Sequence, residues 1–573
     1  MDSCRLLSNA DGSSAKRRAP RRITLRIMLA LTALFVSPAL MAANGDLDTT
    51  FNGGAFDIHV GTNDGANCVI VQQDGRVLLG GFSVPSTNPY EGYWALVRRN
   101  SNGTLDSTFG SGSGQVVIPV GGFTGTRPVN GSIDSQVVQS DGKILAAGYG
   151  FDPTGTYHIW QLIRFNADGT LDASFGSGGK VSTPTSLSLS DDRPGAIALQ
   201  HDGKPVVAGF EVSGANPNQK PVVARYTTAG VLDPTFATGG IFHLPSSFLG
   251  TARPVTIQPD GKILVGITGL GFGSGGNTIY LPQVMRLTSD GVLDSKFGAQ
   301  GLATLNSAGD DLVGQVAVQP DGKIVVAGDN SHNTQGIVWR LNSNGALDTS
   351  FNGQGWLSVA MPVSAMALLP TGQVLVSGTD TTVPIQKLEV ARVTAGGLLD
   401  TSFTNTAGQS GIVESAAPGV GLMEIDSMAL APDGRFVISG YDSDSDSSRH
   451  FMVARYQGDA LRVRPKDFTF TSVTGVPVST VQVSNVIRIT SLTSGASVPI
   501  QVSGGSYSIN GDPFVRRLGY VKNGDQVMVE HTSAATSGTA VTTTLKVGGL
   551  NAPNSPWIQH GGKVVATFTS TTQ

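Results

Sequence analysis

Short apolar segments separated by glycine-rich turns recur along the chain from about residue 60 to residue 456, and long amphipathic helical patterns are not visible. In one well-formed unit, the alternation of apolar and polar positions predicts four strands over 314–319, 323–328, 337–341 and 356–360. Asp-Gly and Asn-Gly turns separate these strands in pairs, because both central positions of such turns can adopt positive φ. Each unit is therefore predicted to form one four-stranded antiparallel sheet.

Two sequence motifs show how many such units there are. The pattern Leu-Asp-x-x-Phe occurs seven times, with its aspartate at positions 48, 106, 172, 233, 294, 348 and 400. The pattern Asp-Gly-Lys/Arg occurs six times, and Thr371-Gly372-Gln373 is its degenerate seventh copy. An arginine stands eight residues before each later Leu-Asp-x-x-Phe aspartate, and Arg455 is an unpaired seventh arginine. Seven units of near sixty residues are thus predicted.

Seven four-stranded units without helices predict an all-β, seven-bladed β-propeller, with an open solenoid as the alternative. The ends of the repeat region favour the propeller. The region begins at Asn44 in the middle of a unit, whereas the last unit ends near Tyr456 without its own Leu-Asp-x-x-Phe. We therefore expect residues 47–60 to supply the outermost strand of the last blade, closing the ring as three strands plus one and removing exposed edges.

These motifs resemble the delta-60 repeat family of bacterial exported proteins. The resemblance is carried by the segments that begin at Gln258 and Gln319, which read Gln-Pro-Asp-Gly-Lys-Ile-Leu-Val-Gly and Gln-Pro-Asp-Gly-Lys-Ile-Val-Val-Ala-Gly. It covers about residues 44–457 and implies a propeller over 44–460. It implies no known catalytic residue and no known ligand.

From about Arg464 the sixty-residue period disappears, and Ser, Thr and Val dominate. Strands are predicted at 481–489, 506–509, 526–530 and 563–568, which together indicate a β-sandwich over 463–573. Segments that begin at Asp467, Ser484 and Gly504 resemble an immunoglobulin-like module found in secreted bacterial proteins. This resemblance implies a spacer or adhesion role without chemistry.

The N-terminus has the order of an export signal. A basic stretch precedes an apolar run over 27–36, and the small residues Ala42 and Ala43 follow. The run is shorter than the roughly 20 apolar residues that span a bilayer, so residues 1–43 are predicted to be a cleaved signal peptide. A buried N-terminal helix is the alternative. The mature protein is then expected to be exported to the periplasm, cell surface or medium, without membrane insertion.

Charge and cysteine content bear on the class of partner and on covalent cross-links. The first 42 residues hold seven basic and two acidic residues, which leaves 31 basic and 40 acidic residues and a net charge of −9. A nucleic-acid partner usually needs a basic face, so none is expected. Cys68 is the only cysteine after the signal, so no intramolecular disulfide is predicted.

Residues present in every unit are interpreted as scaffold, because each blade must fold while a ligand site needs asymmetry. The motif aspartate is expected to cap backbone donors or to pair with an arginine, and the phenylalanine to pack between blades. Strand direction places the loops after the second and fourth strands at one end of the blades. Because those loops vary, we expect a ligand site at that end.

The candidate site residues at the variable end are aromatic, acidic or basic: Trp94, His158, Trp160, Asp192, Arg193, Asp310 and Asp311. Aromatic side chains beside glycines suit sugar or peptide binding, although Trp94 and Trp160 also suit ordinary packing. Acidic neighbours are candidate acid and base groups for hydrolysis, but they usually point apart, which favours a solvated or hairpin-capping role.

Asp442, Asp444 and Asp446 resemble the start of a calcium loop, but the glycine and distant glutamate of an EF-hand are absent, which favours a solvated hairpin tip. No other cofactor is indicated. The sequence favours an exported, non-enzymatic binding or structural scaffold, whose partner is a glycan, a peptide or an envelope protein. The alternative is a polysaccharide hydrolase or lyase with its site at the channel mouth.

Overall fold

The computed structural model describes residues 43–85, 92–120, 131–152, 157–185, 191–212, 219–245, 248–272, 278–305, 311–330, 335–380, 386–419, 421–445, 448–551 and 558–573. The predicted signal peptide, apart from Ala43, lies outside these residues. Over the described part of the chain, no helix is long and apolar enough to cross a membrane.

The described residues before 457 form seven four-stranded antiparallel sheets, numbered 1 to 7 along the chain. Sheets 1 to 3 each consist of four consecutive strands, paired in sequence order. Their strands are β2 (Asn63–Val71), β3 (Val77–Val84), β4 (Tyr93–Arg99) and β5 (Gln115–Ile118); β6 (Ser132–Val138), β7 (Ile144–Phe151), β8 (His158–Phe165) and β9 (Lys180–Thr183); β10 (Arg193–Leu199), β11 (Pro205–Val212), β12 (Gln219–Arg225) and β13 (Ile241–His243).

Sheets 4 to 6 repeat this order, and sheet 7 runs β26-β27-β28-β1. Their strands are β14 (Gly250–Ile257), β15 (Ile263–Phe272), β16 (Thr278–Leu287) and β17 (Leu302–Thr304); β18 (Gln315–Val318), β19 (Ile324–Asp329), β20 (Gly336–Leu341) and β21 (Trp356–Val359); β22 (Ala365–Leu368), β23 (Val374–Asp380), β24 (Lys387–Val393) and β25 (Ile412–Ala416); β26 (Met423–Leu430), β27 (Phe436–Ser443), β28 (Arg449–Tyr456) and β1 (Ala55–Ile58).

The Asp-Gly-Lys turns are hairpins, but of another type than the sequence suggests. Gly322 has a φ of +85°, whereas Asp321 is not among the described residues with positive φ. The Asp321 carboxylate instead accepts a hydrogen bond from the Lys323 amide. The expectation of positive φ at both central positions is therefore wrong, because the aspartate side chain stabilises the turn from an ordinary conformation.

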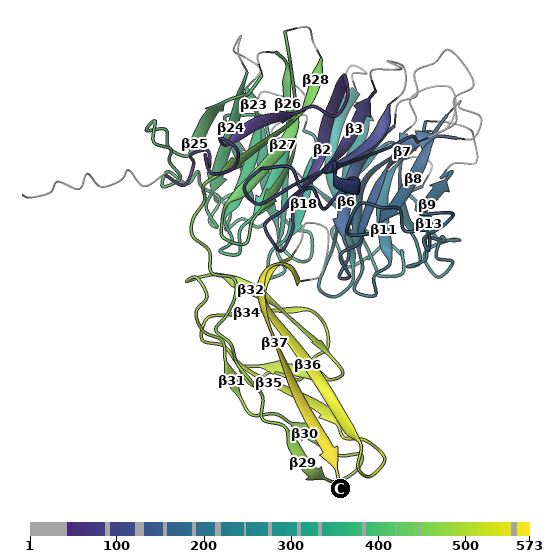
Figure 1. Ribbon diagram of the computed structural model, residues 1–573, viewed down its shortest axis with the longest axis vertical. Helices are drawn as coiled ribbons and strands as arrows, with labels where there is room; N and C mark the ends of the chain where they lie inside the picture. Colours follow the sequence, from purple (N-terminus) through teal and green to yellow (C-terminus); the bar gives the residue numbers. More distant parts are fainter. Residues whose placement is uncertain are drawn as a thin grey trace, which may run out of the picture. The chain divides into compact units, whose positions relative to one another are not determined.

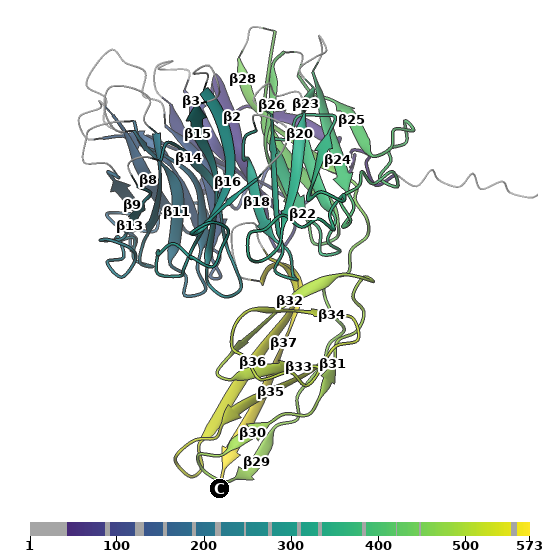
Figure 2. The same cartoon turned by 180° about the vertical axis from the view of Figure 1, so that it is seen from behind.

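The predicted pairing of the two ends of the repeat region is confirmed. β1 pairs with β28, with Ala55 opposite Ala454 and Ile58 opposite Phe451. In both Figure 1 and Figure 2, β2 from the start of the repeat region lies beside β26 and β28 from its end. The first strands of successive sheets contact one another, and the first strand of sheet 7 contacts that of sheet 1.

One group of side chains recurs in all seven sheets, and we call it the Arg–Asp–Phe latch. In each latch the arginine Nε lies 2.6 to 2.9 Å from the aspartate Oδ2, and its guanidinium carbon lies 4.3 to 5.1 Å from the centre of the phenylalanine ring. The latches are Arg98–Asp106–Phe109, Arg164–Asp172–Phe175, Arg225–Asp233–Phe236, Arg286–Asp294–Phe297, Arg340–Asp348–Phe351, Arg392–Asp400–Phe403 and Arg455–Asp48–Phe51.

Six of the seven latches also bind a backbone carbonyl of the next sheet. The Arg98 Nη1 donates to the carbonyl of Ala167 in sheet 2, and Arg455 of sheet 7 donates in the same way to Ser101 of sheet 1. The planar guanidinium thereby joins a carboxylate, a ring face and a neighbouring backbone at once. The predicted pairing of the motif aspartate with an arginine is confirmed. The second carboxylate oxygen of the aspartate accepts hydrogen bonds from the residue two positions later, as Asp106 does from the amide and hydroxyl of Thr108.

Sheet 6, whose turn departs from the motif, keeps this arrangement. Gly372 has a φ of +88°, close to that of Gly322. The Gln373 Nε2 donates to Asp400 at 2.8 Å, where Lys323 in sheet 5 reaches Asp348 at 2.9 Å. Arg392 donates to the Asp459 carboxylate instead of a backbone carbonyl. The degenerate turn therefore replaces the usual contacts with equivalent ones, and sheet 6 keeps its four strands in the regular order.

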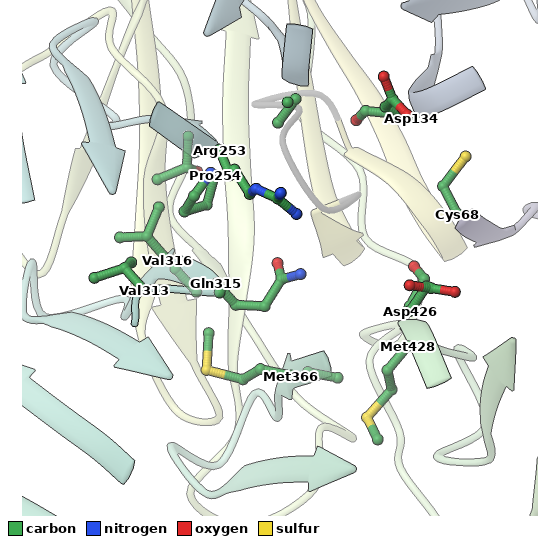
Figure 3. A pocket seen from close by; sticks show the side chains of 18 of the residues that line it. Cys68, Asp134, Arg253, Pro254, Val313, Gln315, Val316, Met366, Asp426 and Met428 are labelled. Carbon is green, nitrogen blue, oxygen red and sulfur yellow. The ribbon is translucent and has the colours of Figure 1, made fainter. Parts of the chain in front are cut away.

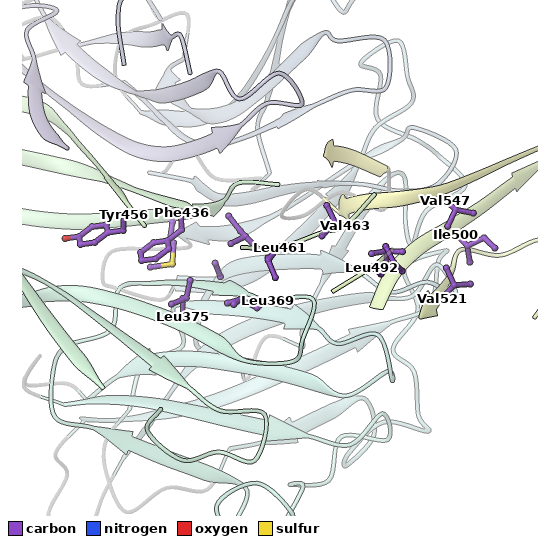
Figure 4. Close-up of a cluster of buried hydrophobic side chains, with 14 of the residues drawn as sticks. Leu369, Leu375, Phe436, Tyr456, Leu461, Val463, Leu492, Ile500, Val521 and Val547 are labelled. Atoms are coloured by element: carbon purple, nitrogen blue, oxygen red, sulfur yellow. The ribbon is translucent and has the colours of Figure 1, made fainter. Parts of the chain in front are cut away.

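Apolar side chains fill the spaces along the sheets. Figure 4 shows Phe436 and Tyr456 of sheet 7, whose rings stack with centres 5.1 Å apart, and Leu461 in the segment that follows. Cys68 is buried in such a cluster, and its burial raises the pKa of its thiol. It is the free cysteine of the described residues.

The C-terminal module has two sheets. The first runs β29 (Val473–Val476), β37 (Ile558–Thr572), β36 (Ala540–Asn551), β32 (Ser497–Ser503) and β34 (Gly519–Lys522). In the second, β35 (Gln526–Thr532) pairs with β30 (Val481–Val483), β31 (Ile487–Arg488) and β33 (Ser506–Ile509). Ile500, Val521 and Val547 are buried here (Figure 4). The prediction of a single strand over 481–489 is wrong, because residues 484–486 are not part of a strand and separate β30 from β31.

Candidate functional site

The two ends of the sheets differ in what they carry. The latches and the Asp-Gly turns lie where the first strand meets the second and the third meets the fourth. The first strands, one from each sheet, surround a cavity of 1190 Å³ that extends along them as far as Pro259 and Pro320 at the Asp-Gly turns. Its charged lining residues lie toward the other end of these strands, which we call the cavity end. The lining includes charged side chains from sheets 2, 3, 4, 5 and 7, so we take the cavity as the candidate site.

A shared backbone irregularity places residues in this cavity. In five of the first strands, the pairing with the second strand contains a bulge. The residues at the bulge have no partner on the second strand; they are Asn67, Asp134, Gly195, the Arg253-Pro254 pair and Asp426. Such bulges bend a strand and redirect a side chain. Each of these residues stands seven positions before the aspartate of its Asp-Gly turn, with Pro254 next to Arg253. Gly314 and Ser364 are the counterparts in sheets 5 and 6, so the seven positions hold five different residue types.

Carboxyl groups from sheets 2 and 7 form one side of the cavity, which we call the acidic sector: Asp134, Glu424 and Asp426. Loss of solvent raises the pKa of Asp134 to about 7, although Arg253 and Arg193 oppose the shift. Loss of solvent and repulsion from Glu424 raise the pKa of Asp426 well above its usual value. Both groups are therefore carboxyls that lack sufficient compensation for a negative charge.

Arg193 and Arg253, from sheets 3 and 4, form the basic sector. Both side chains are exposed to the cavity. The Arg193 guanidinium lies 4.5 Å from the centre of the Tyr149 ring. Figure 3 shows Arg253 projecting into the cavity, with Asp134 and Asp426 across from it.

The third side of the cavity comes from sheets 5 and 6, whose residues at the bulge position, Gly314 and Ser364, carry no charge. One carboxyl group lies on this side, that of Asp329 in β19, and loss of solvent raises its pKa to about 7. We call four uncharged residues of this side the neutral sector: Val313, Gln315, Val316 and Met366. Figure 3 shows Gln315 pointing inward beside Arg253, and Met366 below it. The cavity thus has an acidic side, a basic side and a third side that is uncharged except for Asp329.

Two of the acidic residues predicted for the ligand site are instead buried and bonded to neighbouring loop and strand residues. Asp192 is buried, and its carboxylate accepts bonds from the Thr185 hydroxyl at 2.8 Å and the Val212 amide at 3.0 Å. Asp311 is also fully buried and forms a β-bridge with Asn330. Asp310 lies outside the described residues. Arg193, by contrast, lines the cavity as described above.

The predicted aromatic residues pack beneath the site. Trp94 is buried, and its indole N–H donates to the Tyr149 carbonyl at 2.8 Å. Trp160 is fully buried in the core between sheets 2 and 3. The His158 ring meets the Tyr149 ring edge-on, with ring centres 5.0 Å apart, and its Nδ1 lies 3.0 Å from the Asp191 carboxylate. These contacts give the two tryptophans a packing role and place His158 behind the Tyr149–Arg193 pair.

The predicted calcium-loop residues lie at the outer part of sheet 7. Asp442 is buried and accepts a hydrogen bond from the Gly419 amide, and the Asp444 carboxylate lies 3.1 Å from His450. Loss of solvent and a shared hydrogen bond with Asp442 raise the pKa of Asp57 to about 8. Asp446 lies outside the described residues, among which no group of three or more His, Cys, Asp or Glu side chains is arranged to hold a metal ion.

Sequence reasoning missed Asp134, Arg253 and Asp426. It searched the loops, whereas these residues lie within strands. Aligning the seven units on their Asp-Gly turns would have found them, because the position seven residues earlier changes chemical type from unit to unit. What the sequence does not display is the bulge that turns this position toward the cavity.

Comparison with solved structures gives remote similarities. A Dyadobacter fermentans protein of unknown function is 11% identical, with a TM-score of 0.39, and the match covers 71% of this chain and 98% of that one. Sqt1 from Chaetomium thermophilum, solved bound to the N-terminus of ribosomal protein L10, is 13% identical with a TM-score of 0.35, over 70% and 98%. Polysaccharide lyase Uly1 is 11% identical with a TM-score of 0.35, over 69% and 90%.

Family comparison is more specific. No curated protein matches the chain. The family described as "Domain of unknown function (DUF5122) beta-propeller" matches six segments, at residues 72–109, 139–175, 200–236, 258–297, 319–351 and 369–403. Each segment runs from an Asp-Gly turn, or its degenerate copy, through a Leu-Asp-x-x-Phe motif. These six segments of the chain are therefore similar to β-propeller repeats of the DUF5122 family.

Proposed function

We propose that this protein is an exported binding scaffold: a closed, seven-bladed propeller that holds a ligand in the cavity between its first strands. One observation carries the proposal. The latch end repeats the same contacts in every sheet, whereas the bulge positions facing the cavity hold Asn, Asp, Gly, Arg, Gly, Ser and Asp in turn. Symmetry suffices for folding, but recognition of a ligand needs differences between sheets.

Two further parts of the proposal rest on the sequence. Residues 1–43 have the basic, apolar and small-residue order of an export signal. The C-terminal module is an immunoglobulin-like spacer that presents the propeller. Intact-mass measurement of the mature protein tests export, since retention of Cys4 would contradict cleavage.

Screening a glycan array and a peptide library for binding tests the cavity. Arg253→Ala is expected to weaken any ligand by about tenfold, because a charged hydrogen bond to a ligand contributes roughly 1.5–3 kcal/mol. Lys296→Ala is the matched control, since it removes one exposed positive charge at the latch end. Equal effects of the two changes would contradict a site in the cavity.

A polysaccharide hydrolase or lyase is the second candidate, and the raised pKa of Asp134 favours it. A carboxyl that titrates near pH 7 is suited to proton transfer at neutral pH. If the protein is an enzyme, Asp134→Asn abolishes turnover while binding persists. A scaffold loses affinity in graded steps and shows no turnover with any bound glycan.

A further inference from the structure

We infer that the cavity recognises a short peptide segment that carries both an ammonium or guanidinium group and a carboxylate, together with an apolar side chain. The inference rests on the proposed binding function and specifies its ligand. It follows from how the charges of the cavity are distributed, sheet by sheet.

Among the described residues, no cationic side chain forms an ion pair with Asp134 or Asp426 of the acidic sector. Arg193, Arg253 and Arg449 act on these carboxyls from farther away. No side-chain hydrogen bond to Asp134 or Asp426 is present among the described residues. Arg253 is near enough to act on both carboxyls, yet burial keeps the pKa of each above the usual aspartate value. A ligand cation would supply the missing charge, since an opposite charge within a few ångströms favours the carboxylate form.

The basic sector is available for an anion. Arg193 and Arg253 are exposed to the cavity, and neither forms an ion pair at 4.0 Å or less with a described carboxylate. A guanidinium binds a carboxylate through two parallel hydrogen bonds, so either arginine suits a peptide carboxylate. Cation and anion sites on opposite sides of one cavity then favour a ligand with both charges.

The neutral sector supplies the apolar contact. Val313, Val316 and Met366 line the side contributed by sheets 5 and 6, and the flexible thioether of a methionine adapts to different apolar groups. A cavity of 1190 Å³ is larger than that of a typical drug-sized site, so it accommodates several peptide residues. Neutral glycans would use neither charged sector.

Affinity selection from two random tetrapeptide libraries tests the inference with the full mature chain. One library has free termini, and the other is acetylated and amidated. We expect enrichment of peptides from the first library that contain Lys or Arg and an apolar residue. Equal enrichment from the blocked library, without charged residues, would overturn the inference.

Charge-removing variants then locate the contacts, with the most enriched peptide as probe. Asp426→Asn and Arg253→Met are each expected to lower its affinity by about tenfold or more. Asp290→Asn and Lys296→Ala remove the same charges at the latch end and are expected to leave the affinity unchanged. Losses of equal size in the control variants would overturn the assignment.

Proton linkage gives an independent readout. Because a bound cation favours ionised carboxyls, affinity should rise between pH 5 and pH 8, and binding at pH 7 should release protons, as measured by calorimetry in buffers of different ionisation enthalpy. A pH-independent affinity would overturn the inference. If glycans bind in an Arg253-dependent way and peptides do not, the inference fails while the binding function stands; if no ligand depends on cavity residues, both fail.

Discussion

The latch end and the cavity end of the sheets are formed by the same strands, yet they use charge in opposite ways. At the latch end each arginine is matched to an aspartate, as with Arg340 and Asp348 at 2.6 Å. At the cavity end no described arginine or lysine is paired with Asp134 or Asp426 in this way, and Arg253 projects into the cavity (Figure 3). Matched charges stabilise the fold, whereas unmatched charges remain available to a ligand.

The pKa values of the carboxyl groups record this difference. At the latch end, the bonds from Ser174 and Lys143 lower the pKa of Asp172. At the cavity end, desolvation raises the pKa of Asp134 to about 7. Latch stability is accordingly present above the usual aspartate pKa of 3.8 and is lost as pH falls through the lowered value of the folded state.

The largest expected effect concerns the latch that joins the two ends of the repeat region. Asp48→Ala leaves the buried Arg455 without its carboxylate and is expected to cost roughly 3–5 kcal/mol. Calorimetry should show a lower Tm, and limited proteolysis should cut first near residues 451–456, next to β1.

Asp348→Ala is the matched control for this change. It removes the same contacts from Arg340, but its sheet is continuous in sequence. It should lower the Tm without exposing residues 451–456 to protease. The same cleavage pattern in both variants would contradict a special role of the Asp48 latch in closure.

An intermediate effect is expected where charges are unmatched outside the cavity. Asp57 on the closing strand shares a hydrogen bond with Asp442, and Asp444, Asp64 and His450 also act on these two carboxyls. Because the pKa of Asp57 is about 8 folded and near 3.8 unfolded, the folded state holds a proton that the unfolded state has lost between these values. Stability should therefore fall as pH rises from about 4 to about 8.

Asp57→Asn tests this expectation, because the amide can donate to Asp442 without a proton to lose. The variant should raise the Tm more at pH 8 than at pH 4, measured by calorimetry at both values. Asp74→Asn, at an exposed turn, is the control and should show no such difference. A gain that does not depend on pH would contradict the coupled carboxyl pair.

The smallest expected effect restores a repeated contact. Gln373→Lys places an ammonium beside Asp400, as Lys323 does beside Asp348, and should stabilise the protein by at most about 1 kcal/mol, the range of partly exposed ion pairs. A small rise in Tm at low salt that disappears at high salt is expected. A lower Tm would show that the glutamine contact is the better one in sheet 6.

The fold of the repeat region was predictable because the same motifs occur in each of its seven units. The strands predicted over 314–319 and 356–360 correspond to β18 and β21, and the closing role of 47–60 was evident from a missing motif at one end and a surplus one at the other. The C-terminal module has no repeat to average over. The break at 484–486 therefore went unnoticed, and so did β32 and β36.

The cavity residues were less predictable for a different physical reason. Alternation assigns a side chain to one face of a strand, but a bulge shifts that assignment by one residue. Asp134 and Asp426 therefore lie at positions that alternation alone does not place in a cavity. The prediction for Asp192 is wrong for a different reason. Asp192 precedes Arg193 at the expected end of the strand, but its carboxylate accepts hydrogen bonds from Thr185 and Val212 and does not line the cavity.

The pairing of β1 with β28 also sets an order of events in folding. Arg455 and Asp48 are separated by 407 positions in the sequence, so this contact is among the least local in the chain. Closing so long a loop costs more conformational entropy than any hairpin within a sheet, and non-local contacts of this kind slow folding. The six sheets with four consecutive strands can form one by one during synthesis. The seventh stays incomplete, with the edge of β28 unpaired, until both ends of the repeat region meet, which makes ring closure the step most exposed to aggregation.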